Sequence, residues 1–202
     1  MDGMKKRNVG RPRDGNPAET RREILEAAEE CFAASGFVGA TTRQVAARAG
    51  VNVATLHYHF GNKERLYRAV LDAAVSGEVA EPERSGSPVE RLTAVVESLW
   101  AYGWTRPALP RLSLLHRLAG PPAPRGGGHE PLDDPRARLL SRTIAGVGVK
   151  GAYRPDEAAR FVLVLMDGAL VASQNALDAE APSPEAARSA VVAAALRVTG
   201  LA

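Results

Sequence analysis

Polar and aromatic side chains that can contact nucleic acid are concentrated in one short segment, residues 41–66. Its middle part, VNVATLHYHF, begins with small residues and carries a hydroxyl, two imidazoles and a phenol. Small side chains at the start of a helix allow it to enter the major groove of DNA, and the polar groups can reach phosphates and base edges. This pattern indicates recognition of double-stranded DNA.

Three short helices must position these side chains. Thr41 can cap the first helix, with Gln44 closing a capping box, and Gly50 supplies the turn that follows. Asn52 can cap a second helix, whose large apolar residues lie four apart and face the core. Two short helices joined by a glycine turn are typical of a helix-turn-helix.

A third helix begins after Asn62 and gives an independent indication of an anion. Lys63 lies in its first turn, where a cation opposes the positive end of the helix dipole. A phosphate bound at the free N–H groups of this helix, with Lys63 beside it, would resolve the conflict. We therefore expect a DNA phosphate there.

The sequence GVNVATLHYHFGNKERL at residues 50–66 resembles the DNA-binding signature of the TetR family of transcriptional regulators, and the similarity extends over about residues 20–71. The resemblance implies that four positions contact bases or thymine methyl groups: Arg43, Val53, Ala54 and Tyr58. It implies that four others hold phosphates: Thr42, Thr55, His57 and Lys63. The family usually has tyrosine where this chain has His57, so a tyrosine contact does not carry over to this position.

A metal site and a dinucleotide-binding site are the alternatives to DNA binding. His57 and His59 suggest a metal, but residues two apart on a helix face different directions, so phosphate contact or packing is favoured and we expect no metal site. The GVGVKG stretch at residues 146–151 matches a dinucleotide-binding fingerprint. The preceding RARLLSRTIA predicts an amphipathic helix and not a buried strand, so we expect a helix–helix turn, no cofactor and no enzymatic activity.

The charge distribution also favours a nucleic-acid partner for the N-terminal part. The whole net charge of +3 lies within residues 1–75, and the remainder is neutral. Cys31 is the single cysteine, which excludes a disulfide within the chain. The start of the sequence has no apolar leader, and Asp167 interrupts the longest apolar run, so we expect a cytoplasmic protein without a membrane segment.

The periodicity predicts an all-α fold, and the resemblance implies an N-terminal three-helix DNA-binding domain followed by a C-terminal helical ligand-binding and dimerisation domain. We expect a flexible basic tail over residues 1–19, the DNA-binding domain over 20–80 and the second domain over 87–202. The later helices are expected at these ranges: 63–79, 89–104, 108–118, 135–147, 155–177 and 184–198. In the tail, Arg11 and Arg13 either enter a minor groove or stay solvated.

Two features of the second domain suggest a ligand site. Trp100 and Trp104 lie close together, and aromatic side chains often line apolar pockets, although a core position is equally open to them. Asp167 lies inside an apolar helix, with Gln174 about two turns further along the same face. A buried carboxylate must be paired, protonated or functional, so Asp167 either orients a ligand or pairs with an arginine, within the chain or across a subunit interface.

Small residues recur in the last two helices, for example Gly168 and Ala190, and allow helices to approach closely. The family resemblance implies that these helices form a four-helix bundle with a second subunit. We therefore expect a homodimer that represses transcription from a pseudo-palindromic operator and is released by a small-molecule effector. The alternatives are a dimeric DNA binder without an effector and, from a different class, a nucleotide-dependent enzyme.

Overall fold

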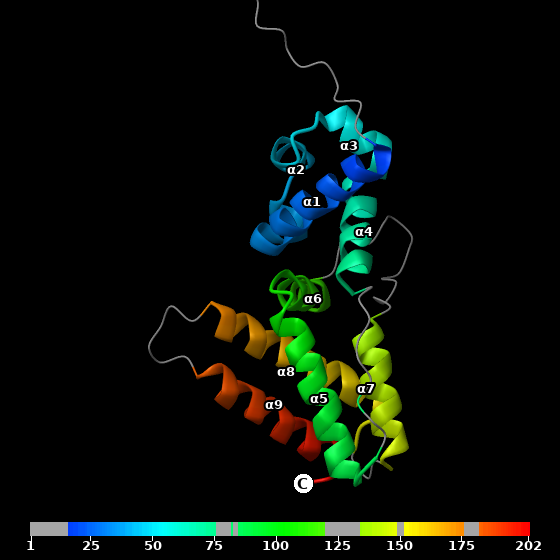
Figure 1. Ribbon diagram of the computed structural model, residues 1–202, viewed down its shortest axis with the longest axis vertical. Helices are drawn as coiled ribbons and strands as arrows, with labels where there is room; N and C mark the ends of the chain where they lie inside the picture. The colour runs from blue at the N-terminus through cyan, green and yellow to red at the C-terminus, as the bar shows by residue number, and fades with distance from the viewer. Residues whose placement is uncertain (1–15, 76–81, 83–84, 120–133, 149–151, 176–181) are drawn as a thin grey trace, which may run out of the picture.

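The computed structural model describes residues 16–75, 82, 85–119, 134–148, 152–175 and 182–202, and every regular element in these ranges is a helix, which confirms the predicted all-α fold. Figure 1 shows the first four helices at one end of the molecule, with α6 between them and the rest. The helices are α1 (Pro17–Gly39), α2 (Thr42–Arg48), α3 (Val53–Phe60), α4 (Lys63–Val75), α5 (Pro88–Trp104), α6 (Ala108–Ala119), α7 (Pro135–Gly146), α8 (Pro155–Gln174) and α9 (Pro184–Thr199).

Side-chain caps begin α2, α3 and α4 where the sequence predicted them. Thr41 Oγ1 accepts a hydrogen bond from the backbone N–H of Gln44 at 3.2 Å, and Gln44 Oε1 accepts one from the backbone N–H of Thr41 at 2.9 Å. Asn52 and Asn62 each accept a hydrogen bond of 2.8 Å from the backbone N–H three residues further on. These bonds satisfy N–H groups that a helix start otherwise leaves without partners.

The first helix begins earlier than expected. Asn16 caps it by accepting a hydrogen bond of 3.1 Å from the N–H of Ala18, and Pro17 is its first residue. Residues 17–19 therefore belong to α1 and not to the predicted tail. Arg11 and Arg13 lie outside the described residues, as do residues 76–79 of the predicted third helix of the motif.

The core of the N-terminal unit recruits a helix from beyond the predicted domain boundary. Phe32 of α1 and Tyr67 of α4 meet edge to face, with ring centroids 4.9 Å apart. Leu109 and Leu112 of α6 are buried in the same cluster. Because α6 buries Leu109 and Leu112 in this core and also packs against α8, it joins the N-terminal unit to the helices beyond the expected boundary at residues 80–87.

A second core joins α5, α7, α8 and α9. Each of these helices begins with proline at its first position, as expected for α7, α8 and α9, whereas α5 begins one residue before its expected start. Leu99, Val162 and Ala195 are fully buried there. The glycine fingerprint follows α7 and not a strand, and Gly148 has a φ of +72°. Residues 120–133 and 149–151 lie outside the described residues.

Candidate nucleic-acid interface and buried polar network

The second helix of the motif, α3, is fixed to the N-terminal core by two side chains. Leu56 is fully buried and Phe60 is nearly so. The turn before α3 is closed by a hydrogen bond of 3.0 Å from the N–H of Val51 to the carbonyl of Ala46, and Gly50 has a φ of +67°. Because both anchors lie on one side of the helix, the opposite side is turned outward.

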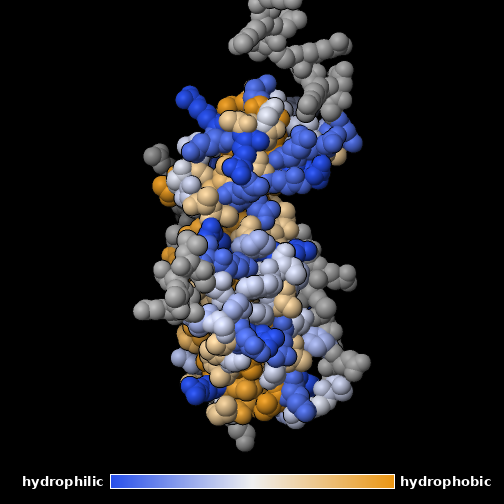
Figure 2. Space-filling model, turned by 60° about the vertical axis from the view of Figure 1, so that its left-hand side comes forward, coloured by the Kyte–Doolittle hydropathy of each residue, from blue (hydrophilic) through white to orange (hydrophobic). Residues whose placement is uncertain are grey.

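The outward side of α3 carries several of the residues expected to bind DNA. Ala54, His57 and Tyr58 are exposed, and Tyr58 is 86% exposed. Val53 and Thr55 are half-buried. On the face drawn in Figure 2, hydrophilic side chains cover much of the upper unit, which holds α3. The helix is therefore rigidly held while its polar side remains free to meet a partner.

The remaining expected contacts lie on α2 and α4. Arg43 is exposed in the first turn of α2, beside the half-buried Thr42. Lys63 donates a hydrogen bond of 3.4 Å to the carbonyl of Val38, and its ammonium group lies 4.5 Å from the centroid of the Phe37 ring. The end of α1 therefore supplies an internal partner for this cation. The expectation of an external anion at Lys63 was based on the helix dipole alone and did not include this contact with the end of α1.

His57 and Thr55 already make local hydrogen bonds. His57 Nδ1 lies 2.6 Å from the carbonyl oxygen of Gly61, the residue that ends α3. The hydroxyl of Thr55 donates to Asn52 Oδ1 at 3.1 Å. Each side chain thus has one polar atom committed within the motif, which limits what it can still offer to DNA.

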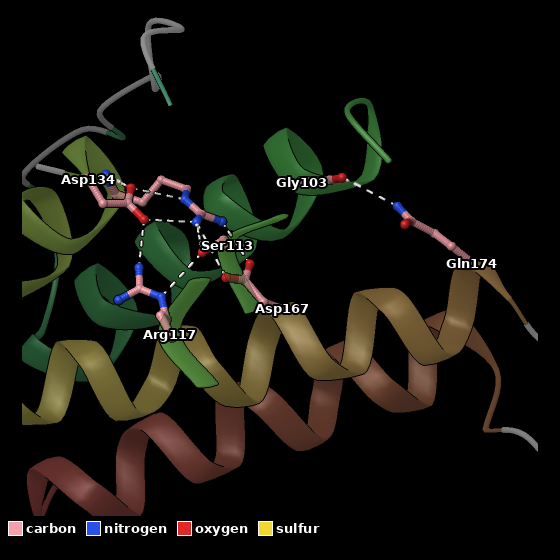
Figure 3. A network of polar contacts seen from close by, with 7 residues as sticks. Gly103, Ser113, Arg117, Asp134, Asp167 and Gln174 are labelled. Carbon is pink, nitrogen blue, oxygen red and sulfur yellow. Dashed lines mark hydrogen bonds and ion pairs between the residues drawn. The ribbon is translucent and has the colours of Figure 1, made fainter. Parts of the chain in front are cut away.

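A second constellation of polar groups lies inside the C-terminal unit, centred on Arg136. This fully buried side chain donates from Nη1 to Asp167 Oδ1 at 2.8 Å and from Nη2 to Asp134 Oδ2 at 2.8 Å. Nη2 also lies 2.8 Å from Ser113 Oγ. Arg117 donates to Asp134 Oδ2 at 2.7 Å. Figure 3 shows how these groups, from α6, α8 and the start of α7, converge on one point.

The two carboxyl groups of this network titrate differently. Burial by itself would raise the pKa of Asp134, but Arg136 and Arg117 outweigh burial and hold that pKa below its ordinary value. Burial dominates at Asp167 and raises its pKa, against the opposing effect of Arg136. Two arginines and two aspartates balance in charge, as a buried ionic cluster requires.

Asp167 and Gln174 do not form one ligand-binding stripe. Asp167 bonds to Arg136 of α7, whereas Gln174 Nε2 donates to the carbonyl of Gly103 in α5 at 3.4 Å. The next residue, Asn175, accepts a hydrogen bond of 2.7 Å from Arg111 of α6. These side chains tie α8 to three different helices. The alternative that Asp167 pairs with an arginine within the chain is what the structure shows.

Trp100 and Trp104 lie on α5, whereas the Arg136 network is formed by side chains of α6, α8 and the start of α7. Their rings stack with centroids 6.5 Å apart and an interplanar angle of 15°; Trp100 is buried and Trp104 is 42% exposed. Both border an open, shallow pocket of about 430 Å³, which Pro184, Glu185 and Arg188 at the start of α9 border on the other side. Asp167, which the sequence analysis grouped with the two tryptophans, is not among the residues that border this pocket.

Sequence reasoning missed Arg136, although a signal for it exists. In the stretch PRARLLSR, Arg136 lies three and four residues before Leu139 and Leu140, and so on the apolar side of the helix. A charged residue on an apolar side, together with a carboxylate in another apolar helix, indicates a buried pair. Asp134 was equally visible as the residue that caps a helix beginning with proline.

No group of three or more His, Cys, Asp or Glu side chains in the described ranges is placed to hold a metal ion. Within the same ranges, none of the helices combines the length and apolar character needed to cross a membrane.

Comparison with known proteins places the motif in a defined context. Residues 24–70 match the family model described as bacterial regulatory proteins, tetR family. The chain is 33% identical to the HTH-type transcriptional repressor AcnR of Corynebacterium glutamicum over 145 residues, which are 69% of this chain and 72% of AcnR. It is 38% identical to the HTH-type transcriptional activator FasR of Mycolicibacterium smegmatis over 48% of either chain.

The fold is similar to that of a solved regulator. The crystal structure of HlyIIR, a hemolysin II transcriptional regulator, superimposes with a TM-score of 0.60 and covers 91% of this chain and 99% of HlyIIR. The sequence identity is 18%, so this likeness concerns the fold alone.

Proposed function

This chain belongs to the tetR family of bacterial regulatory proteins, and we propose that it is a dimeric repressor released from a pseudo-palindromic operator by a small molecule. As a family member it is a DNA-binding transcriptional regulator and not an enzyme. We propose repression because AcnR, which matches over 69% of this chain, is named a repressor.

The outward side of α3 is the observation that carries the DNA-reading part of the proposal. Leu56 and Phe60 hold the helix, while Tyr58 leaves 86% of its surface uncovered. A helix that is fixed on one side and polar on the other can enter a major groove without a change in fold. Thr42, Arg43, Val53, Ala54, Thr55, His57, Tyr58 and Lys63 are proposed as the contact residues.

Selection of bound duplexes from a random DNA library tests this part. We expect a pseudo-palindromic consensus with half-sites about one helical turn, ~10 bp, or a related spacing apart. Tyr58→Ala and Arg43→Ala should each cost ~1–3 kcal/mol of binding free energy and relax specificity. Lys63→Ala should weaken binding to all duplexes alike, and its thermal unfolding is measured in parallel because Lys63 also bonds to Val38. A selection without any palindromic consensus would contradict the proposal.

An uncovered apolar stripe on α8 supports the dimer. Phe161, Leu165 and Gly168 lie on one side of the helix, with Phe161 47% and Leu165 37% exposed. On α9, which packs beside α8, Ala190 and Ala193 are exposed. Small and apolar side chains on two adjacent helices suit close packing against the same helices of a second subunit.

Gly168→Leu tests this interface with little risk to the single chain. A Cβ added at Gly168 would meet no atom within 4 Å, so the larger side chain fits the subunit but would crowd a partner helix. Sedimentation should show a dimer for the wild type and a weakened or dissociated dimer for the variant. Ala34→Leu, at an exposed site on α1, is the matched control and should leave the dimer intact. A wild-type monomer at micromolar concentration would contradict this part of the proposal.

The pocket beside Trp100 and Trp104 is proposed as the effector site. Its two stacked indoles provide apolar contact area, and Arg188 and Glu185 can orient a polar group. Asp167 and Gln174 are proposed to act from behind the pocket, by fixing α8 to α7 and to α5. Arg136 bonds to Asp167 of α8 and to Ser113 of α6, and α6 also packs in the N-terminal core. A shift of α8 can therefore displace α6 and, through it, the unit that holds α3.

Tryptophan fluorescence reports directly on this proposal, because Trp100 and Trp104 are the two tryptophans of the chain. In a screen of aromatic small molecules, an effector should change this fluorescence and raise the melting temperature. It should also lower operator affinity through a coupling of ~1–3 kcal/mol. A compound that releases DNA without changing the fluorescence would place the effector elsewhere. A screen that finds no such compound would favour a DNA binder without an effector.

A further inference from the structure

The hydrogen bond between His57 and Gly61 fixes the form of the imidazole. Nδ1 lies 2.6 Å from a carbonyl oxygen, which can only accept, so Nδ1 carries the hydrogen. A neutral imidazole has one N–H, and therefore its other nitrogen, Nε2, is a bare acceptor. The ring is exposed on the outward side of α3.

A neutral His57 is thus unsuited to a phosphate. Phosphate diester oxygens accept hydrogen bonds, and an unprotonated Nε2 offers them only a lone pair. A second proton converts Nε2 into a donor and gives the ring a positive charge, which forms the stronger, charge-assisted kind of hydrogen bond. We propose that His57 binds a DNA phosphate only as the imidazolium ion, so that operator binding takes up protons. This inference rests on the proposed role of α3 as the DNA-reading helix.

The second proton leaves the local fold intact. Nδ1–H is present in both forms, so the bond to Gly61 at the end of α3 is the same before and after protonation. A positive charge in the last turn of a helix is also favoured by the helix dipole. The change therefore affects what the ring offers to DNA and not how the helix ends.

Neighbouring charged groups are mostly engaged elsewhere. Lys63 bonds to Val38, Arg48 pairs with Glu30, and the guanidinium of Arg21 lies 4.3 Å from the centroid of the Phe60 ring. The other titratable groups on α2, α3 and the first turn of α4 are Arg43, Tyr58, His59, Glu64 and Arg65. Arg65 lies beside the bond, because its side chain is 3.5 Å from the position of a Cβ on Gly61. A phosphate would add the negative charge that favours an imidazolium in this mainly cationic surrounding.

The test measures binding of the full chain to a duplex recovered by the library selection, at fixed ionic strength from pH 8 to pH 6. Histidine titrates in this range, and linkage requires affinity to rise as pH falls when the complex holds more protons than the free protein. We expect up to two protons to be taken up per dimer, one per subunit, and the dissociation constant to fall by up to about 10-fold per pH unit for each proton taken up. The dependence on salt should also be steeper at pH 6 than at pH 8, by about one unit per subunit.

Three variants separate His57 from other sources of pH dependence. His57→Tyr and His57→Gln place neutral donors at this position, so their binding should hardly change between pH 6 and pH 8. His59→Gln removes the neighbouring histidine on the same helix and should keep the wild-type response. Circular dichroism of each variant confirms that the helices remain.

The outcomes are distinct. A wild-type dissociation constant that stays the same from pH 8 to pH 6, with DNA still bound, would overturn the proton-linked contact and leave the regulator proposal standing. An undiminished response in His57→Gln would overturn it equally. If the selection yields no bound duplex at either pH, the proposed function itself fails, and this inference fails with it.

Discussion

The helix caps of the N-terminal motif and the buried network around Arg136 in the C-terminal unit are polar contacts of different range. In the motif, Thr41, Asn52 and Asn62 each cap a helix by bonding to a backbone group three residues away. In the C-terminal unit, Arg136 bonds to Asp167, 31 residues further on. Local contacts form when one helix forms, whereas the Arg136 network exists only when three helices have packed.

This difference separates the positions where a substitution changes binding from those where it changes the fold. The outward side of α3 carries exposed side chains, so replacing Tyr58 should alter the proposed contacts to DNA and have little effect on the fold. Arg136 and Asp167 are fully buried, so replacing either leaves a charge in a low-dielectric interior without its partner. The DNA-reading surface can thus vary freely, while the network constrains the unit behind it.

The largest effect on stability is expected from Arg136→Met, because this variant removes the centre of the buried network. The variant keeps much of the side-chain volume but leaves Asp167 unpaired and removes one partner of Asp134. Breaking a buried ion pair in this way costs ~3–5 kcal/mol of the free energy of unfolding. Urea unfolding monitored by circular dichroism measures the loss.

Arg160→Met is the matched control for that variant. Arg160 pairs with Asp156 at 2.7 Å on the surface of α8, and its side chain is 56% exposed. An exposed pair of the same length contributes little because water screens it. Equal stability of the two variants would contradict a special role for the buried network.

The range of these contacts also explains how far sequence reasoning reached. The caps of α2, α3 and α4 and the proline starts of the later helices lie within windows of a few residues, and their predictions were confirmed. The placement of α6 in the N-terminal core depends on how two units pack, which no local pattern of Leu109 and Leu112 encodes. The fold class was therefore predictable, and the division of the helices between the cores was not.

The candidate sites follow the same rule. The outward residues of α3 were predictable because their orientation follows from Leu56 and Phe60 within one helix. The need of Asp167 for a partner was also evident, but the sequence offers many arginines and only the packed helices select Arg136. Trp100 and Trp104 were correctly recognised as neighbours. The sequence did not indicate that the start of α9 faces them, because that depends on how the helices pack.

A smaller effect, of about 2 kcal/mol at neutral pH, is expected when Asp134 becomes Asn. The arginines hold the folded-state pKa of Asp134 below its unfolded value, so its stabilising effect is present above about pH 4 and is lost as pH falls further. The asparagine variant does not titrate there. Its deficit relative to the wild type should therefore shrink below about pH 4, as measured by thermal unfolding across pH.

At Glu29 of the N-terminal unit, the pKa shift and its effect on stability have the opposite sign to those at Asp134. Burial raises its folded-state pKa, so its ionised form is disfavoured in the folded state and stability is lost as pH rises through that value. Glu29→Gln should stabilise the protein at neutral pH, by less than ~1 kcal/mol because the group is half exposed, and this gain should vanish below about pH 4. Shifts of the same sign in both variants would contradict this contrast.

The most local effect is expected from Asn52→Ala, which removes the cap of α3 and should cost ~1 kcal/mol of the free energy of unfolding. Because the contact is local, amide exchange should increase in α3 while α6 to α8 stay protected, whereas Arg136→Met should act on those helices. Asn52→Asp keeps a capping oxygen, so it should retain stability but bind DNA more weakly through repulsion from the phosphates. Exchange that spreads evenly over both units in Asn52→Ala would mean that the motif is not locally stabilised, and the comparison between the two units would fail.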